Sequence, residues 1–385
     1  MTTRPLRTTR RSLLAFTAAG LAVGGLAQPA RRAHAAPPSL DLNAWIEEQV
    51  DYIVGKQVAS GALRGPTDDQ LQPYFSNWAA QGLAAANTPR SREALGKYIG
   101  WMLNHVNTAE EDPYGIPGTV SDWHYDEETG EETSLGEYSS TDAGTTVPMI
   151  AAYDAFQTGD RDLQHLVMEN LDTYWVMASA TTDGQYGVRM PDHLCWARPN
   201  VKMKYVQDNG VVYKGLSKLA WLMRRAGRGQ QGRFLALKAR QTRRAMIDIL
   251  WDEERKNWGW GHGETLFKDS EPWDRFMADA WCQYWQVQLD VTKPNDRMSK
   301  LAWQAYTAPD AYPRWMYNEI DNNFPHTEMA YSAVLMGEPE NAVRLLQLCK
   351  EQFSDNNWGS LPWYHGEAGH TLRTARLLLD TGYGK

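Results

Sequence analysis

Residues 209–226, with the sequence NGVVYKGLSKLAWLMRRA, carry the clearest helical pattern in the chain. Their apolar side chains recur at i, i+4, i+7 and i+11, the spacing that lines one face of an α-helix, at Val212, Leu216, Leu219 and Met223. The connection 226–229 (AGRG) follows at once, and a second helical pattern begins near Gly232. Because so short and glycine-rich a connection turns the chain back on itself, the stretch predicts a helical hairpin.

The same pairing extends over the rest of the chain. Hydrophobic periodicity predicts twelve helices, two to a hairpin, near residues 42–58, 74–86, 91–106, 142–156, 160–180, 209–226, 232–251, 273–289, 296–306, 326–335, 339–353 and 367–379. Short turns alternate with long connections that are rich in aromatic, acidic and glycine residues, at 107–141, 181–208, 252–272, 308–325 and 354–366. Within the first of these, residues 119–125 alternate as a β-strand does, with a turn at Thr129 and Gly130. Short turns at one end and long loops at the other predict a scaffold with one functional face.

The first 36 residues have the features of an export signal. Arg10 and Arg11 precede an uncharged run over residues 12–28, and Ala33-His34-Ala35 matches a small-x-small cleavage pattern. Because the run is short for a membrane span, we expect a twin-arginine signal peptide that is cleaved after Ala35 and a secreted protein. Residues 37–385 contain no linker-like segment, so we expect a single domain there.

Composition disfavours several partners and cofactors. Residues 1–35 hold six arginines and no acid, so without them the net charge of −8 becomes about −14, which argues against nucleic acid. No later run is apolar enough to predict a membrane partner after signal cleavage, and three cysteines are too few for a disulfide framework. The chain has no HExxH, zinc-spaced cysteines, phosphate loop or GxSxG motif, so we expect no metal and no cofactor.

Three stretches point to a known family: residues 73–80 (PYFSNWAA), 139–143 (SSTDA), and 205–209 (YVQDN) followed by 212–216 (VYKGL). Each falls at the start of an even-numbered predicted helix. With twelve helices in six hairpins, the chain resembles the six-hairpin glycosidase superfamily, whose fold is the all-α (α/α)6 barrel. The resemblance implies one barrel over residues 37–385, with short β segments in the long loops. Members include hydrolases, lyases and epimerases, so the fold transfers better than the reaction.

The resemblance also implies where the site lies. Inner-barrel helices of such enzymes present site residues at their starts, so we expect one mouth lined by Tyr74, Asp142, Asp208, Trp273, His326 and Glu367. Glycoside hydrolysis needs one protonated carboxyl that donates its proton to the leaving oxygen. It also needs a second carboxylate that activates water or attacks the anomeric carbon. Asp142 and Asp208 are the expected catalytic pair, with Asp142 as base, Asp208 as acid and inversion of configuration. Helix capping is the competing interpretation for either aspartate. Further acidic candidates are Asp274, Glu319 and Asp321.

Tryptophan is abundant, with seventeen in the chain, and many fall in the long loops. Sugar rings stack on aromatic faces, so loop tryptophans suit carbohydrate subsites. Together with polar residues near helix starts they give the expected substrate-binding set: Tyr74, Asn77, Trp78, Trp123, Trp196, Asn209, Trp260, Trp273, Asp274, Trp315, His326, Trp363 and His370.

Two other functions stay open. A polysaccharide lyase on the same barrel would use Tyr or His to remove a uronate proton, and its anionic substrate would need a basic groove such as Arg189, Arg198, Lys202 and Lys204. A non-catalytic glycan-binding protein is the alternative from another class. Epimerase chemistry fits an exported protein less well. The leading hypothesis is a glycoside hydrolase acting on an oligo- or polysaccharide.

Overall fold

A computed structural model of the chain describes residues 40–268, 279–308, 325–356, 358 and 362–383. By their internal contacts, residues 1–36 and residues 37–385 are two separate units. The helices and strands described belong to residues 37–385. The predicted signal peptide lies outside the described residues. No described helix is both long and apolar enough to cross a membrane.

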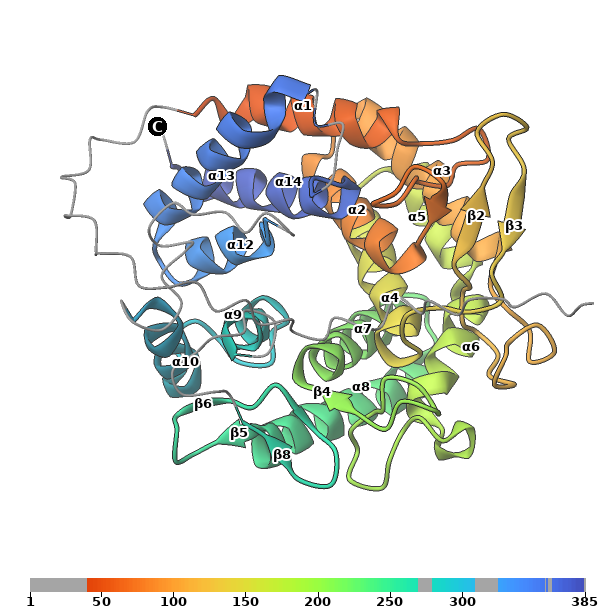
Figure 1. The fold of residues 1–385 in the computed structure, drawn as a ribbon. Coiled ribbons are helices and arrows are strands. Elements are labelled where there is room, and N and C mark those ends of the chain that lie inside the picture. Colours follow the sequence, from red (N-terminus) through yellow and green to blue (C-terminus); the bar gives the residue numbers. More distant parts are fainter. Residues whose placement is uncertain (1–39, 269–278, 309–324, 357, 359–361, 384–385) are drawn as a thin grey trace, which may run out of the picture. The chain divides into compact units, whose positions relative to one another are not determined.

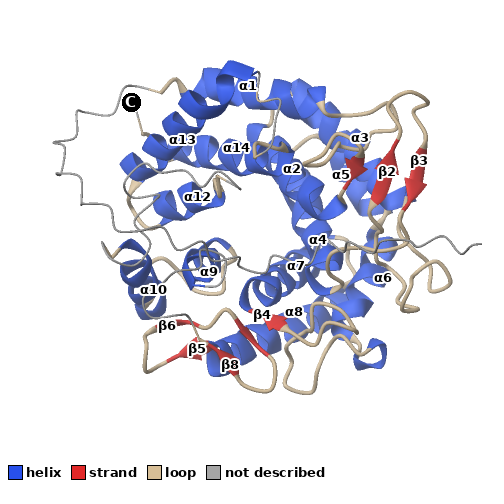
Figure 2. Cartoon of the chain, in the orientation of Figure 1, coloured by secondary structure: helices blue, strands red, loops and turns tan. Residues whose placement is uncertain are grey.

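Six helices form a closed inner ring in which each contacts the next (Figure 1). In ring order they are α2 (Pro73–Ala86), α4 (Asp142–Gln157), α7 (Val206–Arg225), α9 (Trp281–Gln288), α12 (Glu328–Leu335) and α14 (His365–Asp380), and α14 packs on α2. The remaining described α-helices pack outside this ring: α1 (Leu42–Gly55), α3 (Pro89–Asn104), α5 (Arg161–Glu169), α6 (Leu171–Thr182), α8 (Gly229–Ala245), α10 (Arg297–Thr307) and α13 (Pro339–Phe353). The predicted all-α (α/α)6 barrel is confirmed, and helices dominate the view in Figure 2.

Helix ends follow local capping chemistry. Asp41 accepts hydrogen bonds from the first turn of α1, and Thr88 and Ser91 form a reciprocal capping box at the start of α3. The predicted helix over residues 160–180 is instead two helices, because the chain bends at Asn170, whose amide donates to the Leu166 carbonyl oxygen at 2.8 Å. Gly229 begins α8, which ends in a π-helical turn over Met246–Leu250.

Glycines allow two pairs of inner helices to approach closely. A Cβ on Gly82 of α2 would lie 2.4 Å from the Cα of Gly369 on α14, and a Cβ on Gly369 would lie 2.4 Å from the Trp78 carbonyl oxygen. A Cβ on Gly215 of α7 would meet the Thr146 carbonyl oxygen of α4 at 2.4 Å. Only a residue without a side chain fits at these positions, so glycine sets the spacing of both helix pairs.

Short antiparallel strands lie in the long loops, as predicted. One sheet has the order β1 (Gln70–Leu71), β2 (Trp123–Tyr125), β3 (Glu132–Ser134), and another the order β4 (Lys204–Tyr205), β7 (Gly261–His262), β8 (Leu266–Phe267). A third pairs β5 (Trp251–Asp252) with β6 (Asn257–Trp258). The strand expected over residues 119–125 is confined to β2, and its turn at Gly130 has the positive φ of 72° that favours glycine. The pairing of β4 with β7 brings the 252–272 loop beside the start of α7.

The core fills the space between and inside the two layers of helices. Its largest fully buried side chains include Trp45, Trp258, Trp285 and Trp363. All three cysteines, Cys195, Cys282 and Cys349, are buried and free, which confirms that the chain has no disulfide framework.

Candidate active site

Polar residues gather where inner helices begin. They are Tyr74 on α2, Asp142 on α4, Asp208 on α7, Glu328 on α12 and Glu367 on α14. The Gln207 amide donates to the Tyr74 hydroxyl oxygen at 3.0 Å and so joins the starts of α7 and α2. Burial raises the pKa of Tyr74, and the charges of Asp208 and Asp142 raise it further. The starts of α2, α4 and α7 therefore lie close together, and we call the end of the ring at which the inner helices begin the mouth.

Asp142 is the deepest of these carboxyls. Its side chain is fully buried, and its Oδ1 accepts a hydrogen bond from the Ala143 backbone N–H at 2.8 Å. Its Oδ2 has no hydrogen-bond partner among the described residues. Burial raises the pKa of Asp142 well above its usual range, and the charge of Asp208 raises it further. Burial and the neighbouring charge of Asp208 therefore both favour the protonated form of Asp142.

Asp208 lies in the first turn of α7, the inner helix next to α4, and is less buried than Asp142. Its side chain is partly exposed, and no described residue donates a hydrogen bond to its carboxylate. Desolvation raises the pKa of Asp208 from 3.8 to about 7. We call Asp142 and Asp208, which lie on the contacting helices α4 and α7, the aspartate wall.

Glu367 lies on the opposite side of the ring, on α14. Its Oε2 accepts two hydrogen bonds from Thr327, one from the backbone N–H at 2.8 Å and one from the hydroxyl at 2.6 Å. Burial raises the pKa of Glu367 from 4.5 to about 7, and the charge of Glu328 adds to the increase. Its Oε1 carries no hydrogen bond from the described residues, so one oxygen is anchored and the other is available.

Glu328 is the most fully paired carboxylate of the mouth. Its Oε1 accepts from the Trp281 indole at 2.7 Å and the Tyr284 hydroxyl at 2.9 Å, and lies 3.5 Å from His326 Nδ1. Although burial alone would raise the pKa of Glu328, the hydrogen bond and charge of His326 lower it to about 2. We call Glu328 and Glu367 the glutamate wall. The sequence prediction missed Glu328, although it directly follows the pair His326-Thr327 at a predicted helix start.

Aromatic rings line the ring interior between the walls. Trp78 of α2 packs against His370 at 5.2 Å and against Trp285 at 5.1 Å between ring centroids. Burial lowers the pKa of His370 to about 3, so this histidine is neutral. Trp78 and His370, both in the expected substrate-binding set, are almost completely buried and form an apolar floor.

Two asparagines of the expected substrate-binding set are occupied within the protein. Asn209 Oδ1 accepts from the Cys195 backbone N–H at 2.7 Å, and its Nδ2 donates to the Cys195 and Tyr205 carbonyl oxygens. Asn209 therefore holds the loop before α7 in place, and its amide group is already used in hydrogen bonds within the protein and is not available to a sugar. Asn77 is occupied only in part: its Nδ2 donates to the Pro73 carbonyl oxygen at 2.7 Å in its own helix, whereas its buried Oδ1 has no partner among the described residues.

The loop tryptophans divide between rim and core. Trp260 stacks on Phe267 at 4.9 Å and lies 6.2 Å from Tyr205, beside the start of α7, while Lys202 covers Trp196 at 5.3 Å. In contrast, Trp363 is only 1% exposed and packs on Trp358, a position that offers little of its ring to a sugar.

Trp123 pairs with Leu71, two residues before α2 begins, and it also contacts an outer helix. It belongs to β2 and packs against His105 at 4.6 Å, at the end of the outer helix α3. The expectation that Trp123 binds substrate therefore stays a prediction. Some candidates lie outside the described residues: Trp273, Asp274, Trp315, Glu319 and Asp321.

The basic groove that a lyase would need is not assembled. The Arg189 guanidinium donates to the Thr181 carbonyl oxygen and the Thr242 hydroxyl, both at 3.1 Å. Arg198 donates to the Tyr138 carbonyl oxygen, and Lys204 is ion-paired with Asp192. These three cations hold loops together, so of the four predicted groove residues the exposed Lys202, which covers Trp196, is the one left to bind a uronate carboxylate.

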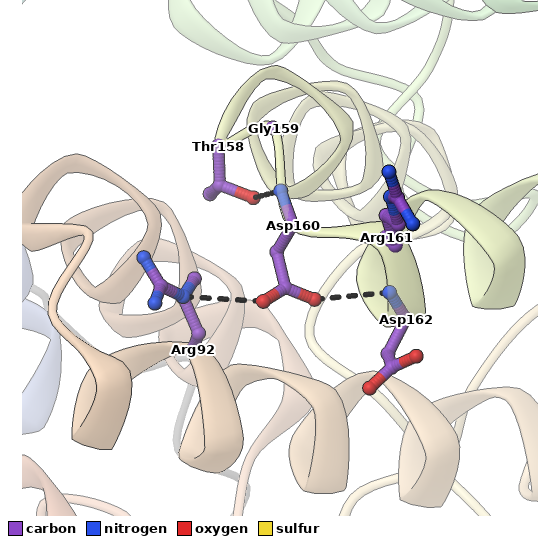
Figure 3. Close-up of a pocket in the computed structure, with 6 residues that line it drawn as sticks. All are labelled: Arg92, Thr158, Gly159, Asp160, Arg161 and Asp162. Atoms are coloured by element: carbon purple, nitrogen blue, oxygen red, sulfur yellow. Dashed lines mark hydrogen bonds and ion pairs between the residues drawn. The ribbon is translucent and has the colours of Figure 1, made fainter.

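A shallow surface pocket lies at the other end of α4 (Figure 3). Asp160 caps α5 by accepting from the Asp162 backbone N–H at 3.0 Å and pairs with Arg92 at 3.2 Å. Sixteen residues of α4 separate it from the start of that helix, which is roughly 24 Å of helix rise. This pocket belongs to a hairpin turn and is separate from the mouth.

Comparison with solved structures shows the same architecture in sugar-processing enzymes. A glycosidase in complex with glucose matches with a TM-score of 0.61 and 14% identity, over 88% of this chain and 97% of that one. The fold is that of the six-hairpin glycosidases. A rhamnosidase from Klebsiella oxytoca with rhamnose bound matches with a TM-score of 0.56 and 13% identity, over 91% of this chain and 66% of that one. An alpha-1,6-mannanase from a Salegentibacter species matches with a TM-score of 0.53 and 11% identity, over 88% and 100%. No family model and no curated protein sequence matches the chain.

Proposed function

We propose that this protein is a glycoside hydrolase whose acid and base come from opposite walls of the mouth. The observation that carries the proposal is the pair Asp208 and Glu367, whose pKa values are both raised to about 7 by burial at inner-helix starts. A carboxyl with a pKa near neutrality can donate or accept a proton at working pH. The fold shared with glycosidases supports sugar as the substrate.

Asp208 is the proposed acid. It is partly exposed and free of hydrogen bonds to described residues, so it can reach a leaving-group oxygen. Asp142 was expected to be the base, but its complete burial and higher pKa make it a poor one. It also shares one wall with Asp208, whereas an inverting enzyme needs its acid and base on opposite faces of the sugar. We assign Asp142 the positioning of Asp208.

Glu367 is the proposed base. Thr327 fixes one carboxylate oxygen and leaves the other to accept a proton from water. Water would then attack the anomeric carbon as the bond to the leaving oxygen breaks and Asp208 protonates that oxygen. Acid and base on opposite walls leave room for the water, which favours inversion.

The test is an assay of the purified protein against a panel of neutral and acidic polysaccharides. We expect reducing ends without unsaturated products from wild type, and none from Asp208→Asn. Asp162→Asn, a matched change in the first turn of the outer helix α5, should keep full turnover. Unsaturated product would identify a lyase. Binding of a glycan without turnover by wild type would identify a binding protein.

Export by the twin-arginine route is part of the proposal and rests on Arg10 and Arg11. Replacing both arginines by lysine should retain the protein in the cytoplasm, as measured by fractionation and immunoblotting. Secretion at the wild-type level would contradict this route.

A further inference from the structure

The outer helix α8 and the turn before it differ in charge from the rest of the chain. Residues 224–245 contain eight arginines and lysines and no aspartate or glutamate, whereas the chain as a whole has a net charge of −8. Such segregation places a strong positive potential on one outer face of an acidic protein.

Several of these cations are not used inside the protein. Arg224, Arg225, Arg233 and Arg240 are exposed, and no described residue forms an ion pair with them. By contrast, Arg243 donates to the Val291 carbonyl oxygen at 2.6 Å, and Arg244 pairs with Asp248 at 3.2 Å. The unpaired arginines therefore point their charge at solvent.

Large apolar side chains stand among the cations. Phe234 and Leu237 of α8 are 39% and 46% exposed, and Val176 of the adjacent helix α6 is 39% exposed. Phe234 packs against Trp175 of α6 at 5.7 Å, which joins the two helices into one surface. These three residues are the majority of the large hydrophobic side chains that the described chain exposes.

The helical period places both kinds of side chain on one side. Arg233, Leu237 and Arg240 follow at i, i+4 and i+7, with Phe234 and Lys238 adjacent to them. We define the basic–apolar face as Val176, Arg233, Phe234, Leu237, Lys238 and Arg240. Helix α8, which carries five of these six residues, packs on α7 outside the inner ring (Figure 1).

We propose that the basic–apolar face docks the protein on an anionic lipid surface. Arginine and lysine attract anionic headgroups, while Phe234 and Leu237 enter the boundary between headgroups and acyl chains. Charge complementarity excludes a second basic–apolar face as partner. A linear polyanion would use the arginines alone, because exposed phenylalanine and leucine gain little from a charged chain that remains hydrated. The proposal does not depend on the mouth or on its chemistry.

The sequence led us to expect no membrane partner, because no run after the signal segment is apolar enough to span a bilayer. That criterion addresses spanning segments and not docking at a surface. Peripheral docking needs only a local patch, because the attraction of each cation falls off within a Debye length of the surface.

Vesicle co-sedimentation of the full chain tests the proposal. Vesicles of phosphatidylglycerol and phosphatidylcholine are compared with phosphatidylcholine alone, at low and high salt. Each cation near the surface strengthens partitioning about fivefold, so Arg233→Glu combined with Arg240→Glu should weaken it by about 100-fold or more. Leu237→Ser should weaken it by roughly fivefold. Both sites are on the surface, so thermal melts should match wild type.

Matched variants separate this face from general effects. Leu135→Ser removes a leucine that is 48% exposed in the acidic β2–β3 region, and Lys97→Glu with Lys300→Glu reverses two exposed lysines elsewhere. Both controls should bind vesicles as wild type does. Residues 1–36 are common to all variants, so equal binding by wild type and the α8 variants would overturn the proposal. Retention on heparin without vesicle binding, unaffected by Leu237→Ser, would also overturn it and identify a polyanion surface.

Discussion

The aspartate wall and the glutamate wall contain the same chemical group in different electrical surroundings. On the aspartate wall two carboxyls lie on contacting helices. The Ala143 N–H is the one hydrogen-bond donor that the described residues offer them, and burial raises both pKa values. On the glutamate wall Trp281, Tyr284 and His326 surround Glu328 and hold its charge, while Glu367 keeps a raised pKa. Burial alone therefore does not set the protonation of a mouth carboxyl. The neighbouring charges decide: His326 lowers the pKa of Glu328, whereas the charge of Glu328 raises that of Glu367.

The largest expected effect concerns the division of roles between the walls. Glu367→Gln should lower kcat by roughly 100-fold to 10,000-fold, because it removes the proton acceptor. Asp142→Asn should cost less than about tenfold, since burial favours the protonated form of Asp142 and its proposed role is to position Asp208. Steady-state kinetics on the identified substrate measure both. A loss for Asp142→Asn as large as that for Glu367→Gln would restore Asp142 as the base.

The second prediction concerns stability. Glu328→Leu leaves the Trp281 indole and the Tyr284 hydroxyl without their acceptor, and each buried unsatisfied donor costs about 1 to 3 kcal/mol. Urea unfolding should therefore show a loss of at least a few kcal/mol, whereas Glu328→Gln, which keeps an acceptor oxygen, should lose less. Equal stability of the two variants would show that the donors find other partners.

Glu328 should respond to pH in the opposite direction to Asp208 and Glu367. Folded Asp208 and Glu367 have pKa values of about 7, above the unfolded values near 4, so the folded state binds more protons in this window. Their contribution to stability is full below about pH 4 and is lost as pH rises through about 7. The pKa of Glu328 is lowered to about 2, so its contribution is present above about pH 4.5 and is lost as pH falls toward 2.

Thermal melts over this range provide the measurement. Glu367→Gln should lose less stability than wild type between about pH 5 and pH 8, because the group that ionises on unfolding is absent. Asp162→Asn, which changes an exposed carboxyl, should follow the wild-type curve. Parallel curves for wild type and Glu367→Gln would mean that Glu367 titrates normally.

The smallest expected effect on kcat/KM is at Tyr74, on α2 between the two walls. Tyr74→Phe removes the hydrogen bond from Gln207, a loss of about 0.5 to 1.5 kcal/mol, which corresponds to a decrease in kcat/KM of roughly tenfold or less. Tyr98→Phe, at another buried tyrosine that donates a hydrogen bond, is a matched control and should leave kcat/KM unchanged. A decrease as large as that of Asp208→Asn would make Tyr74 a direct participant.

Helix positions and the location of the mouth follow from sequence because both depend on local signals. Apolar period and turn residues identify the hairpins, and starts of alternate helices such as Asp142 and Asp208 then fall at one end. The protonation state of a carboxyl does not follow from these local signals, since the hydrogen-bond donors to Glu328 come from Trp281 and Tyr284 on another helix.

The loop tryptophans show the same limit. Trp196 and Trp363 both stand in long connections, yet one lies on the rim and the other is 1% exposed under Trp358. Composition alone cannot tell a loop that folds back over the core from one that remains at the surface. The basic segment 224–245, in contrast, can be recognised directly in the sequence, although the negative net charge of the whole chain does not reveal it.

The contact between Gly82 and Gly369 joins the first inner helix to the last. Because almost the whole ring lies between these two glycines, the barrel stays open during synthesis until α14 has left the ribosome. Until then the mouth lacks Glu367, and the apolar floor around Trp78 lacks His370. Closure is therefore a late, long-range folding event, and the interval before it is when the nascent chain exposes most of its interior and has greatest need of chaperones.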